Sequence, residues 1–187
     1  MAGGRKAWTV GSLQESAETM LQIRAFAPED AEFCFKVRAR AFILAFRDEL
    51  GPEAVAAAVN AYMPSDYVRM AESHTFFVVE EAGDRIGFFT LRRLDQRTAE
   101  IPLIYVELDQ IGRGIGTWCM QSIEAWIASH WPDVSALVVD TVIPRYNGGF
   151  YHKMGFRPVG ETKCHFPDGD VKAIRFDKSL APGRPTT

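Results

Sequence analysis

The stretch Val106-Glu107-Leu108-Asp109-Gln110-Ile111-Gly112-Arg113-Gly114-Ile115-Gly116-Thr117 decides the fold of this chain. It joins an apolar segment, residues 98–106, to a segment with helical spacing of its apolar residues, residues 114–130. Alternate glycines let the backbone turn tightly and let a ligand approach the main chain. Their N–H groups and the helix N-terminus behind them form a cradle for an anion, to which Arg113 adds a positive charge. The stretch therefore predicts a strand, an anion-binding turn and a helix.

Other glycine loops fit this turn less well. A dinucleotide-binding loop needs G-x-G-x-x-G, but Cys119 stands where the third glycine after Gly114 and Gly116 belongs. A P-loop needs Gly-Lys-Ser/Thr, and the chain has no such triplet. A helix start punctuated by glycines, without any ligand, remains the plain structural alternative.

Outward from the turn, the apolar patterns predict a mixed α/β domain. Strands are expected over residues 21–26, 75–80, 86–92, 98–106, 136–142, 157–165 and 170–177. Helices are expected over residues 31–46, 53–61, 66–72, 114–130 and 147–154. The strand over 136–142 is almost entirely apolar, which predicts burial on both faces. The sheet should hold six to seven strands, antiparallel in its first half, with about four helices around it.

The composition is that of one globular domain. The chain has 187 residues, of which 47% are hydrophobic and 24% charged, with a net charge of −3. It lacks the basic footprint of a nucleic-acid binder, and no apolar run approaches the ~20 residues of a membrane span. We expect a flexible tail over residues 1–19, the domain over 20–178 and a disordered tail over 179–187, with Met20 as an alternative start.

The cysteines and histidines show no spacing typical of metal ligands. Cys34, Cys119 and Cys164 lie far apart, and no C-x-x-C pair exists. Cys164 and His165 are adjacent, but neighbours on a strand point to opposite faces. We expect no metal site. Because no signal-peptide pattern begins the sequence, we expect a reduced, cytoplasmic compartment.

The segment IYVELDQIGRGIG, residues 104–116, resembles the pyrophosphate-binding motif of the GNAT acetyltransferases. In that family, a strand ending in a Leu/Ile-Tyr-Val-like triplet leads to Q/R-x-x-G-x-G/A and a helix. Gly114 and Gly116 fall on the two glycine positions, whereas Ile111 occupies the Gln/Arg position and Gln110 lies one residue early. The departure removes one side-chain contact but leaves the main-chain amides of residues 112–117 for the pyrophosphate.

A second segment, FYHKMGF over residues 150–156, resembles the family's F-Y-x-x-x-G-F motif. Many members carry an Asn about seven residues before this Tyr. Pro144 holds that position here, so the nearest Asn, Asn147, becomes the candidate contact. Taken alone, Tyr151 fits a buried core aromatic better than a functional residue, because buried tyrosines are common. Both motifs occur in the family's order, and the resemblance covers roughly residues 21–177.

The resemblance implies a GNAT-like fold and transfer of an acetyl group from acetyl-CoA to a primary amine by direct attack. It implies that acetyl-CoA is held by Tyr105, Val106, Ile111, Gly112, Arg113, Gly114, Ile115, Gly116, Thr117 and Asn147. The sheet of the family parts beside this strand. Pro102 supports a break there, since proline cannot donate to a strand ladder. The N–H of Val106 is then the expected donor to the thioester carbonyl.

Two side chains are expected to transfer protons. By resemblance, Glu100 is the candidate base, with Glu107 or water in reserve; alternatively, Glu100 caps an exposed strand end. Tyr151 is the expected acid for the departing CoA thiolate.

Two other functions remain open from sequence. Ile111 leaves room for a non-catalytic module that senses acetyl-CoA or a nucleotide in the same cleft, and a protein-interaction domain without a ligand is the third option. The acceptor stays open between a small-molecule amine and a protein amino group. We expect no nucleic-acid or membrane partner, and a homodimer remains open. The family builds its acceptor site from the early helices and last strands. Five aromatic residues are candidates for its lining, but core packing is the favoured interpretation of each: Phe42, Phe46, Tyr62, Phe88 and Phe89.

Overall fold

The computed structural model describes residues 20–48, 51–142, 148–166 and 169–180. Its strands are β1 (Leu21–Ala25), β2 (Thr75–Glu81), β3 (Asp84–Arg93), β4 (Thr98–Glu100), β5 (Ile104–Val106), β6 (Ala136–Val142), β7 (Arg157–Phe166) and β8 (Gly169–Ser179). Its α-helices are α1 (Ala31–Phe46), α2 (Pro52–Asn60), α3 (Pro64–Met70), α4 (Ile115–His130) and α5 (Gly148–Lys153). Short 3₁₀ turns cover Pro28–Asp30 and Leu108–Gln110. No helix of the described residues is long and apolar enough to cross a membrane.

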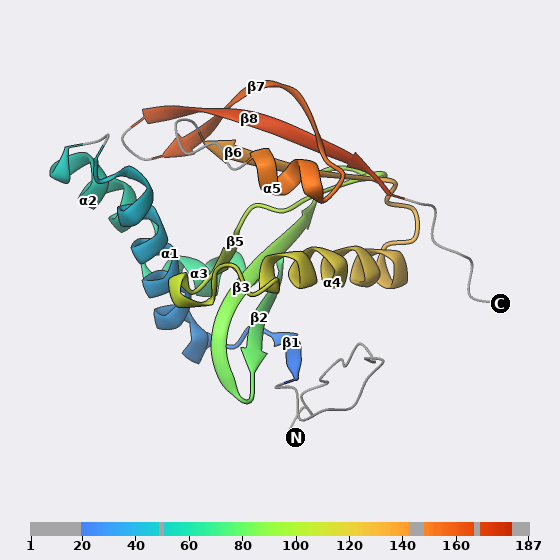
Figure 1. Ribbon diagram of the computed structural model, residues 1–187, viewed down its shortest axis with the longest axis horizontal. Coiled ribbons are helices and arrows are strands. Elements are labelled where there is room, and N and C mark those ends of the chain that lie inside the picture. The colour runs from blue at the N-terminus through green and yellow to red at the C-terminus, as the bar shows by residue number, and fades with distance from the viewer. Residues whose placement is uncertain (1–19, 49–50, 143–147, 167–168, 181–187) are drawn as a thin grey trace.

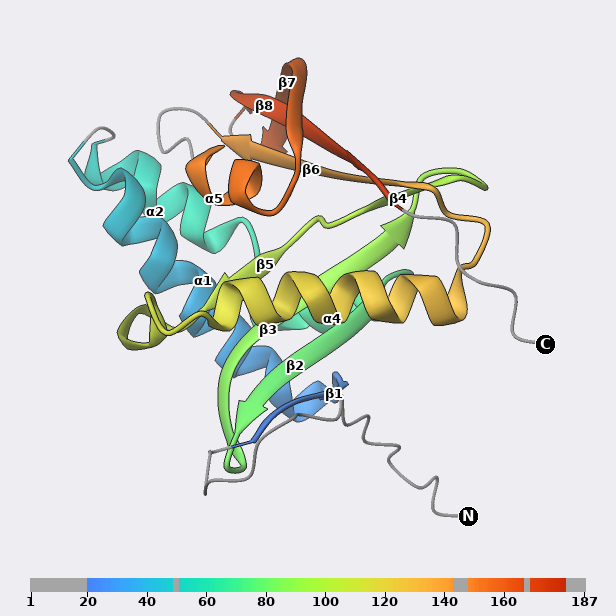
Figure 2. The same cartoon turned by 45° about the vertical axis from the view of Figure 1, so that its right-hand side comes forward.

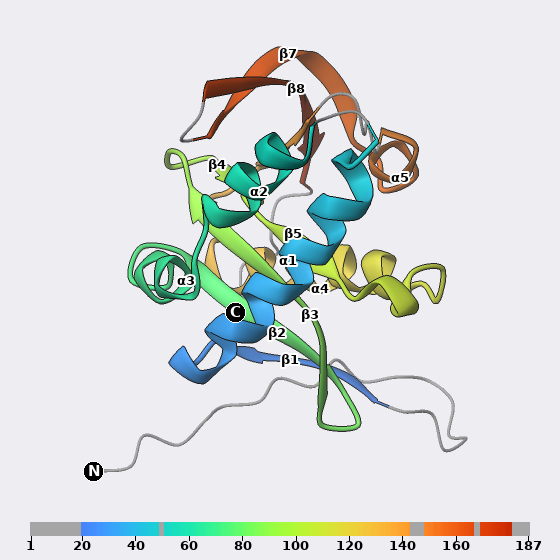
Figure 3. The same cartoon turned by 90° about the vertical axis from the view of Figure 1, so that its left-hand side faces the viewer.

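The strands form one mixed sheet in the order β1-β2-β3-β4-β6-β8-β7, with β5 paired to β3 beside this path. The pair β4–β6 is parallel, and all other pairs are antiparallel. Helices α1, α2 and α3 cover one face, and α4 lies across the other (Figures 1 and 3). The predicted mixed α/β fold with an antiparallel first half is confirmed.

The described strands number eight rather than six to seven, because the strand expected over residues 98–106 is divided. Residues Ile101-Pro102-Leu103 separate β4 from β5. The N–H of Leu103 is bound by the side-chain oxygen of Thr90 at 3.1 Å, in place of a ladder carbonyl. Pro102 has no N–H to continue the ladder, as the sequence predicted. The described α-helices number five rather than about four, because α3 and the one-turn helix α5 both form.

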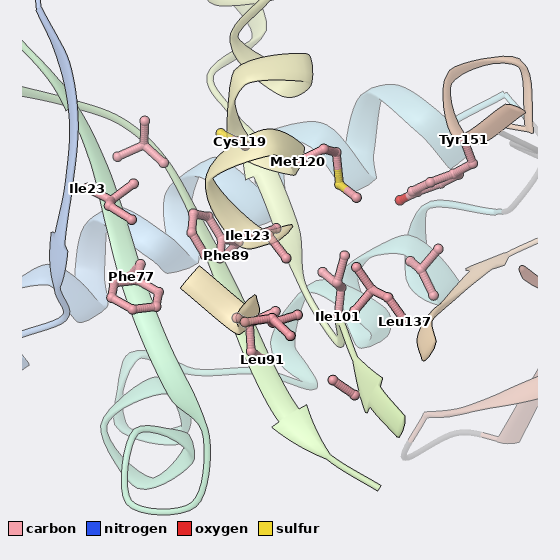
Figure 4. Close-up of a cluster of buried hydrophobic side chains, with 14 of the residues drawn as sticks. Ile23, Phe77, Phe89, Leu91, Ile101, Cys119, Met120, Ile123, Leu137 and Tyr151 are labelled. Carbon is pink, nitrogen blue, oxygen red and sulfur yellow. The ribbon is translucent and has the colours of Figure 1, made fainter. Parts of the chain in front are cut away.

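The main core lies between the sheet and α4 (Figure 4). From α4 it receives a buried stripe at helical spacing: Ile115, Cys119, Met120, Ile123 and Ile127. The sheet supplies Phe77, Phe89, Leu91 and Leu137 among others. Each such side chain contributes roughly 1.5–3 kcal/mol by leaving water. This packing fixes the N-terminus of α4 against the end of β5.

A buried carboxylate anchors the first strand to the first helix. Asp30 is 0% exposed and accepts hydrogen bonds from Arg24 at 2.6 and 2.9 Å and from the N–H of Ala27 at 2.8 Å. Arg85 on β3 contacts it at 3.3 Å. Burial alone would raise the pKa of Asp30, but the hydrogen bonds and charge of Arg24 outweigh it, and the net pKa lies below 3.8.

Candidate active site

The sheet opens between β5 and β6 (Figure 2). Residues Thr98–Glu100 pair in parallel with Ala136–Val138, and the N–H of Ile101 still reaches the carbonyl oxygen of Val138 at 2.9 Å. Beyond Ile101 this pairing ends, because β5 pairs with β3 alone among the described strands. We call the region between β5 and the second half of β6 the β5–β6 opening.

Among the described residues, the main-chain groups on the edge of β5 that faces the opening have no hydrogen-bond partner. On the other edge, the N–H of Glu107 donates to Ile86 and the N–H of Thr90 donates to Leu103, at 2.8 and 2.9 Å. In an antiparallel pair the bonding direction alternates from residue to residue. The N–H and C=O groups of Ile104 and Val106 therefore point away from β3. An extended ligand with amide groups can bind there as an added strand.

The glycine turn continues this edge into α4. Gly112 and Gly114 have φ angles of 89° and 83°, in the left-handed region that favours glycine. Gly114 is the N-cap residue, and no side chain caps the helix. The first helical bond runs from the N–H of Trp118 to the oxygen of Gly114 at 3.0 Å. The N–H groups of residues 115–117 therefore lack helical partners and, with the helix dipole, favour an anion.

Two side chains of the turn add little free positive charge to it. Arg113 donates to both carboxylate oxygens of Glu81 at 2.8 Å and also contacts Gln110. The hydrogen bonds with Glu81 raise the pKa of Arg113 above its ordinary value. Ile111, in the family's Gln/Arg position, is 66% exposed. The turn therefore presents main-chain amides, with Arg113 held nearby by Glu81.

Glu100 lies at the closed end of the opening and is 5% exposed, so the alternative of an exposed strand end is wrong. Its carboxylate forms an ion pair with Arg92 and lies 3.7 Å from Arg175. Arg175 in turn donates to Asp140 at 2.8 and 2.7 Å. Two guanidinium groups therefore lie beside the carboxylate of Glu100. The reserve carboxylate, Glu107, is half-buried and forms an ion pair with Arg40 of α1.

Glu100 faces the side of the sheet that α1, α2 and α3 cover. Its neighbours Ala99 and Ile101 belong to the core on the α4 side, and side chains alternate along a strand. Tyr105 likewise packs against the cluster on the α1 and α3 side. Side chains of Ile104 and Val106 instead pack against the α4 side.

Tyr151 occupies the opposite side of the opening from Glu100. It is 6% exposed and packs in the α4-side core with Phe156 and Phe176, at ring distances of 5.7 and 5.6 Å. Its oxygen points inward, toward Met120 (Figure 4). Burial, and secondarily Tyr105, raise the pKa of Tyr151, so the hydroxyl stays protonated. No hydrogen bond to this hydroxyl comes from the described residues.

A family model described as "Acetyltransferase (GNAT) domain" matches residues 72–158. This chain contains a GNAT acetyltransferase domain. Acetyl-CoA is the acetyl donor that GNAT domains use. The matched region runs from just before β2 to the first residues of β7, and so includes the β5–β6 opening, the glycine turn and Tyr151. Helices α1, α2 and α3 lie outside the match, as do β1 and β8.

Solved structures of GNAT enzymes share the fold. A GCN5-related N-acetyltransferase from Rhodopseudomonas palustris is 18% identical, with a TM-score of 0.70 over 91% of this chain and 100% of its own. The PaiA N-acetyltransferase from Thermoplasma acidophilum, in complex with coenzyme A, is 18% identical, with a TM-score of 0.69 over 86% and 99%. Spermidine N-acetyltransferase from Vibrio cholerae, in complex with CoA and spermine, is 17% identical, with 0.63 over 87% and 96%. No curated protein sequence matches the chain.

The GNAT domain brings most of the predicted site residues together. The free edge at Val106 continues through the turn at residues 111–117, while Glu100 and Tyr151 lie on opposite sides of the opening. Tyr105 does not present its main chain to the opening. Because directions alternate along the strand, its N–H and C=O groups face β3 and its side chain faces α1. Asn147 lies outside the described residues, as do residues 1–19 and 181–187 of the expected tails.

The charged groups around Glu100 were not predicted from the sequence. Arg92, Asp140 and Arg175 come from β3, β6 and β8, and strand register alone brings them to one place. No spacing in the sequence marks them. Among the described residues, no group of three or more His, Cys, Asp or Glu side chains is placed to hold a metal ion.

Proposed function

We propose that this GNAT domain transfers the acetyl group of acetyl-CoA to a primary amine by direct attack. One observation carries the proposal: the free edge of β5 is followed, after the 3₁₀ turn Leu108–Gln110 and the glycine turn, by the uncapped N-terminus of α4. An extended chain of amides that ends in a diphosphate is complementary to such a surface. In acetyl-CoA, the pantetheine supplies the amides and the diphosphate supplies the anion.

Each part of the donor has a proposed binding surface in the chain. The amides of residues 112–117 hold the diphosphate, with Arg113 beside them and Ile111 as an apolar neighbour. Main-chain groups of Ile104 and Val106 bind the pantetheine, and the N–H of Val106 donates to the thioester oxygen. A donor placed before the reaction stabilises the negative charge that develops on this oxygen.

The chemistry needs two proton movements. The amine nitrogen loses a proton and attacks the thioester carbon; the carbon–sulfur bond then breaks, and the thiolate takes up a proton. Glu100 is the proposed acceptor of the amine proton, because it is a buried carboxylate on the α1–α3 side of the opening. Tyr151 is the proposed donor to the thiolate from the α4 side. The two roles thereby fall to opposite sides of the sheet.

Burial limits what Tyr151 can do. Because burial raises its pKa, full proton transfer to a thiolate becomes less favourable. A hydrogen bond from the neutral hydroxyl still stabilises the thiolate as the carbon–sulfur bond breaks. We therefore propose Tyr151 as a hydrogen-bond donor that completes proton transfer late.

The proposed reaction is tested with a panel of amines in matched pairs. Each primary amine is assayed with acetyl-CoA beside its N,N-dimethyl derivative, which cannot form a neutral amide. We expect CoA release and an N-acetylated product with at least one primary amine and none with its derivative. Binding of acetyl-CoA without amine-dependent product from any member would favour the non-catalytic sensor.

A further inference from the structure

Arg38 of α1 is a buried cation without an ion pair in the described part of the chain. The residue is 2% exposed. Its guanidinium makes long contacts, of 3.3 to 3.5 Å, with the carbonyl oxygens of Ala58 and Val59 near the end of α2, and it also donates a hydrogen bond to the side chain of Tyr105. It also lies over the rings of Tyr62 and Phe42, 4.5 and 5.6 Å from their centroids. A buried charge of this kind ordinarily has a carboxylate partner.

Tyr67 of α3 lies in the same region and has an unsatisfied hydroxyl. The residue is 0% exposed, and its Oη atom has no hydrogen-bond partner within the described ranges. Its ring packs edge-on against Phe88 at 5.9 Å and lies 6.3 Å from Tyr62. Burial raises the pKa of Tyr67, and the charge of Arg38 opposes this shift. A buried hydroxyl without a partner is a group that a ligand atom can satisfy.

These groups adjoin the β5–β6 opening. Tyr105 of β5 stacks on Phe88 at 5.5 Å, and its hydroxyl interacts electrostatically with Arg38. Tyr105 lies between Ile104 and Val106, the residues whose main-chain groups face the opening. Tyr62 and Tyr105 are only half-buried, so the cluster is not sealed from solvent. We name Arg38, Tyr62, Tyr67 and Tyr105 the Arg38 cluster.

We propose that the Arg38 cluster binds a carboxylate of the acceptor, so that the acetylated amine belongs to a molecule that also carries a carboxylate. This inference rests on the proposed function. Guanidinium groups bind carboxylates through paired N–H donors, and the Tyr67 hydroxyl supplies another donor. The same cation repels a polyamine, which carries only positive charge. Glu100 lies on the same side of the sheet, and its carboxylate can attract the ammonium group of the same acceptor.

A purely structural role for Arg38 accounts for fewer of these observations. An arginine near the C-terminus of α2 can stabilise its free carbonyl groups. That role explains the contacts with Ala58 and Val59. It does not explain why Tyr67 buries a hydroxyl without a partner beside the same guanidinium.

Binding to the CoA-loaded protein tests the proposal without requiring turnover. Calorimetric titration would compare the common L-amino acids with their C-terminal amides, with spermidine as the cationic control. We expect at least one amino acid to bind ten times more tightly than its amide, and spermidine to bind no better than the amides. Equal affinities within every pair, or preferred binding of spermidine, would overturn the proposal.

Two variants separate recognition from folding. Tyr67→Phe removes only the unpartnered hydroxyl, so its melting temperature should not fall, while the acid-to-amide affinity ratio drops about tenfold. Arg38→Gln should lower that ratio by about a hundredfold. Arg38→Lys keeps the charge but not the paired N–H donors, so its ratio should lie between those of the wild type and Arg38→Gln. If Arg38→Gln does not fold, the affinity ratio of Tyr67→Phe alone tests the proposal. An unchanged ratio in the folded variants overturns the carboxylate site.

The acetyl-CoA melting shift is measured in parallel. We expect it to be the same in wild type, Tyr67→Phe and Arg38→Gln, because the Arg38 cluster lies across the sheet from α4. If acetyl-CoA does not raise the melting temperature of the wild type, the proposed function fails. If it does, but the acid-to-amide affinity ratio is unchanged in the variants, only the carboxylate site fails.

Discussion

Arg92 of β3 and Glu100 of β4 are cross-strand partners, and their side chains form an ion pair at the closed end of the β5–β6 opening. Arg92 is exposed, whereas Glu100 is buried. The proposed base is therefore paired with a guanidinium group that reaches solvent. The ion pair fixes the position of the carboxylate that we propose as the base.

Replacing Glu100 by Gln should lower kcat by 10²-fold or more, since a general base typically contributes about 10²–10⁴-fold. The rise of rate with pH should also flatten. The informative comparison is Arg92→Gln, which removes the ion-pair partner but keeps the carboxylate, so kcat should fall less than in Glu100→Gln. A wild-type pH profile in Glu100→Gln would transfer the role to Glu107 or water.

Gly114 should be intolerant of a side chain. Its φ of 83° makes Gly114→Val costly, since an L-residue pays roughly 1–2 kcal/mol in this conformation. The wild type should gain ~2.7 kcal/mol at a hundredfold excess of acetyl-CoA over its dissociation constant, and the variant should lose most of this gain. Gly51→Ala is the control, because Gly51 is exposed and an added Cβ meets no atom within 4 Å. If acetyl-CoA raises the melting temperature of Gly114→Val as much as that of the wild type, acetyl-CoA does not bind at the glycine turn.

Gly116 tests the same turn from another direction. A Cβ added there would lie 3.3 Å from two ring carbons of Phe150, so Gly116→Ala must push the ring aside. We expect a smaller loss of acetyl-CoA affinity in Gly116→Ala than in Gly116→Val, as measured by titration. Equal affinities in wild type and Gly116→Val would show that the amides of this turn do not contact the donor.

Tyr151→Phe should fold normally, because it removes one hydroxyl and little volume from the α4-side core. We expect kcat to fall about tenfold to a hundredfold, with little change in acetyl-CoA affinity, since the hydrogen bond strengthens as the thiolate leaves. Pre-steady-state kinetics would establish that chemistry limits the rate. Wild-type turnover under that condition would make Tyr151 a packing residue only.

Acid should remove the contribution of Asp30 to stability. The folded-state pKa of Asp30 lies below 3.8, so its ion pairs stabilise the fold above that pH and are lost as the pH falls through the folded pKa. Asp30→Asn should therefore cost about 3 kcal/mol in urea unfolding at pH 7 and progressively less below pH 3.8. The exposed neighbour Glu29→Gln should change little. A cost for Asp30→Asn that does not depend on pH would contradict this account.

The sequence predicted those parts of the site that lie within one continuous segment. The glycine turn carries its own backbone requirements, and Pro102 marked the break between β4 and β5. The packing stripe of α4 followed from helical spacing. These features depend on residues that are close in the chain, which is where periodicity and turn chemistry are informative.

The partners of single side chains could not be predicted in the same way. Arg92 and Arg175 reach Glu100 only through the register of β3, β4, β6 and β8. Arg38 and Tyr67 lie near each other because α1 and α3 pack on the same face of the sheet. Both cases depend on contacts between distant segments, for which one sequence holds no readable pattern.

The free edge of β5 is the feature on which the account depends most, and amide hydrogen exchange by NMR measures it directly. We predict that saturating acetyl-CoA slows exchange of the Val106 amide, and of Ile104 where pantetheine pairs with it. The Tyr105 amide should change little, because by the alternation it already faces β3. Protection confined to other parts of the chain, with exchange at Ile104 and Val106 unaltered, would contradict the proposed binding of acetyl-CoA along this strand.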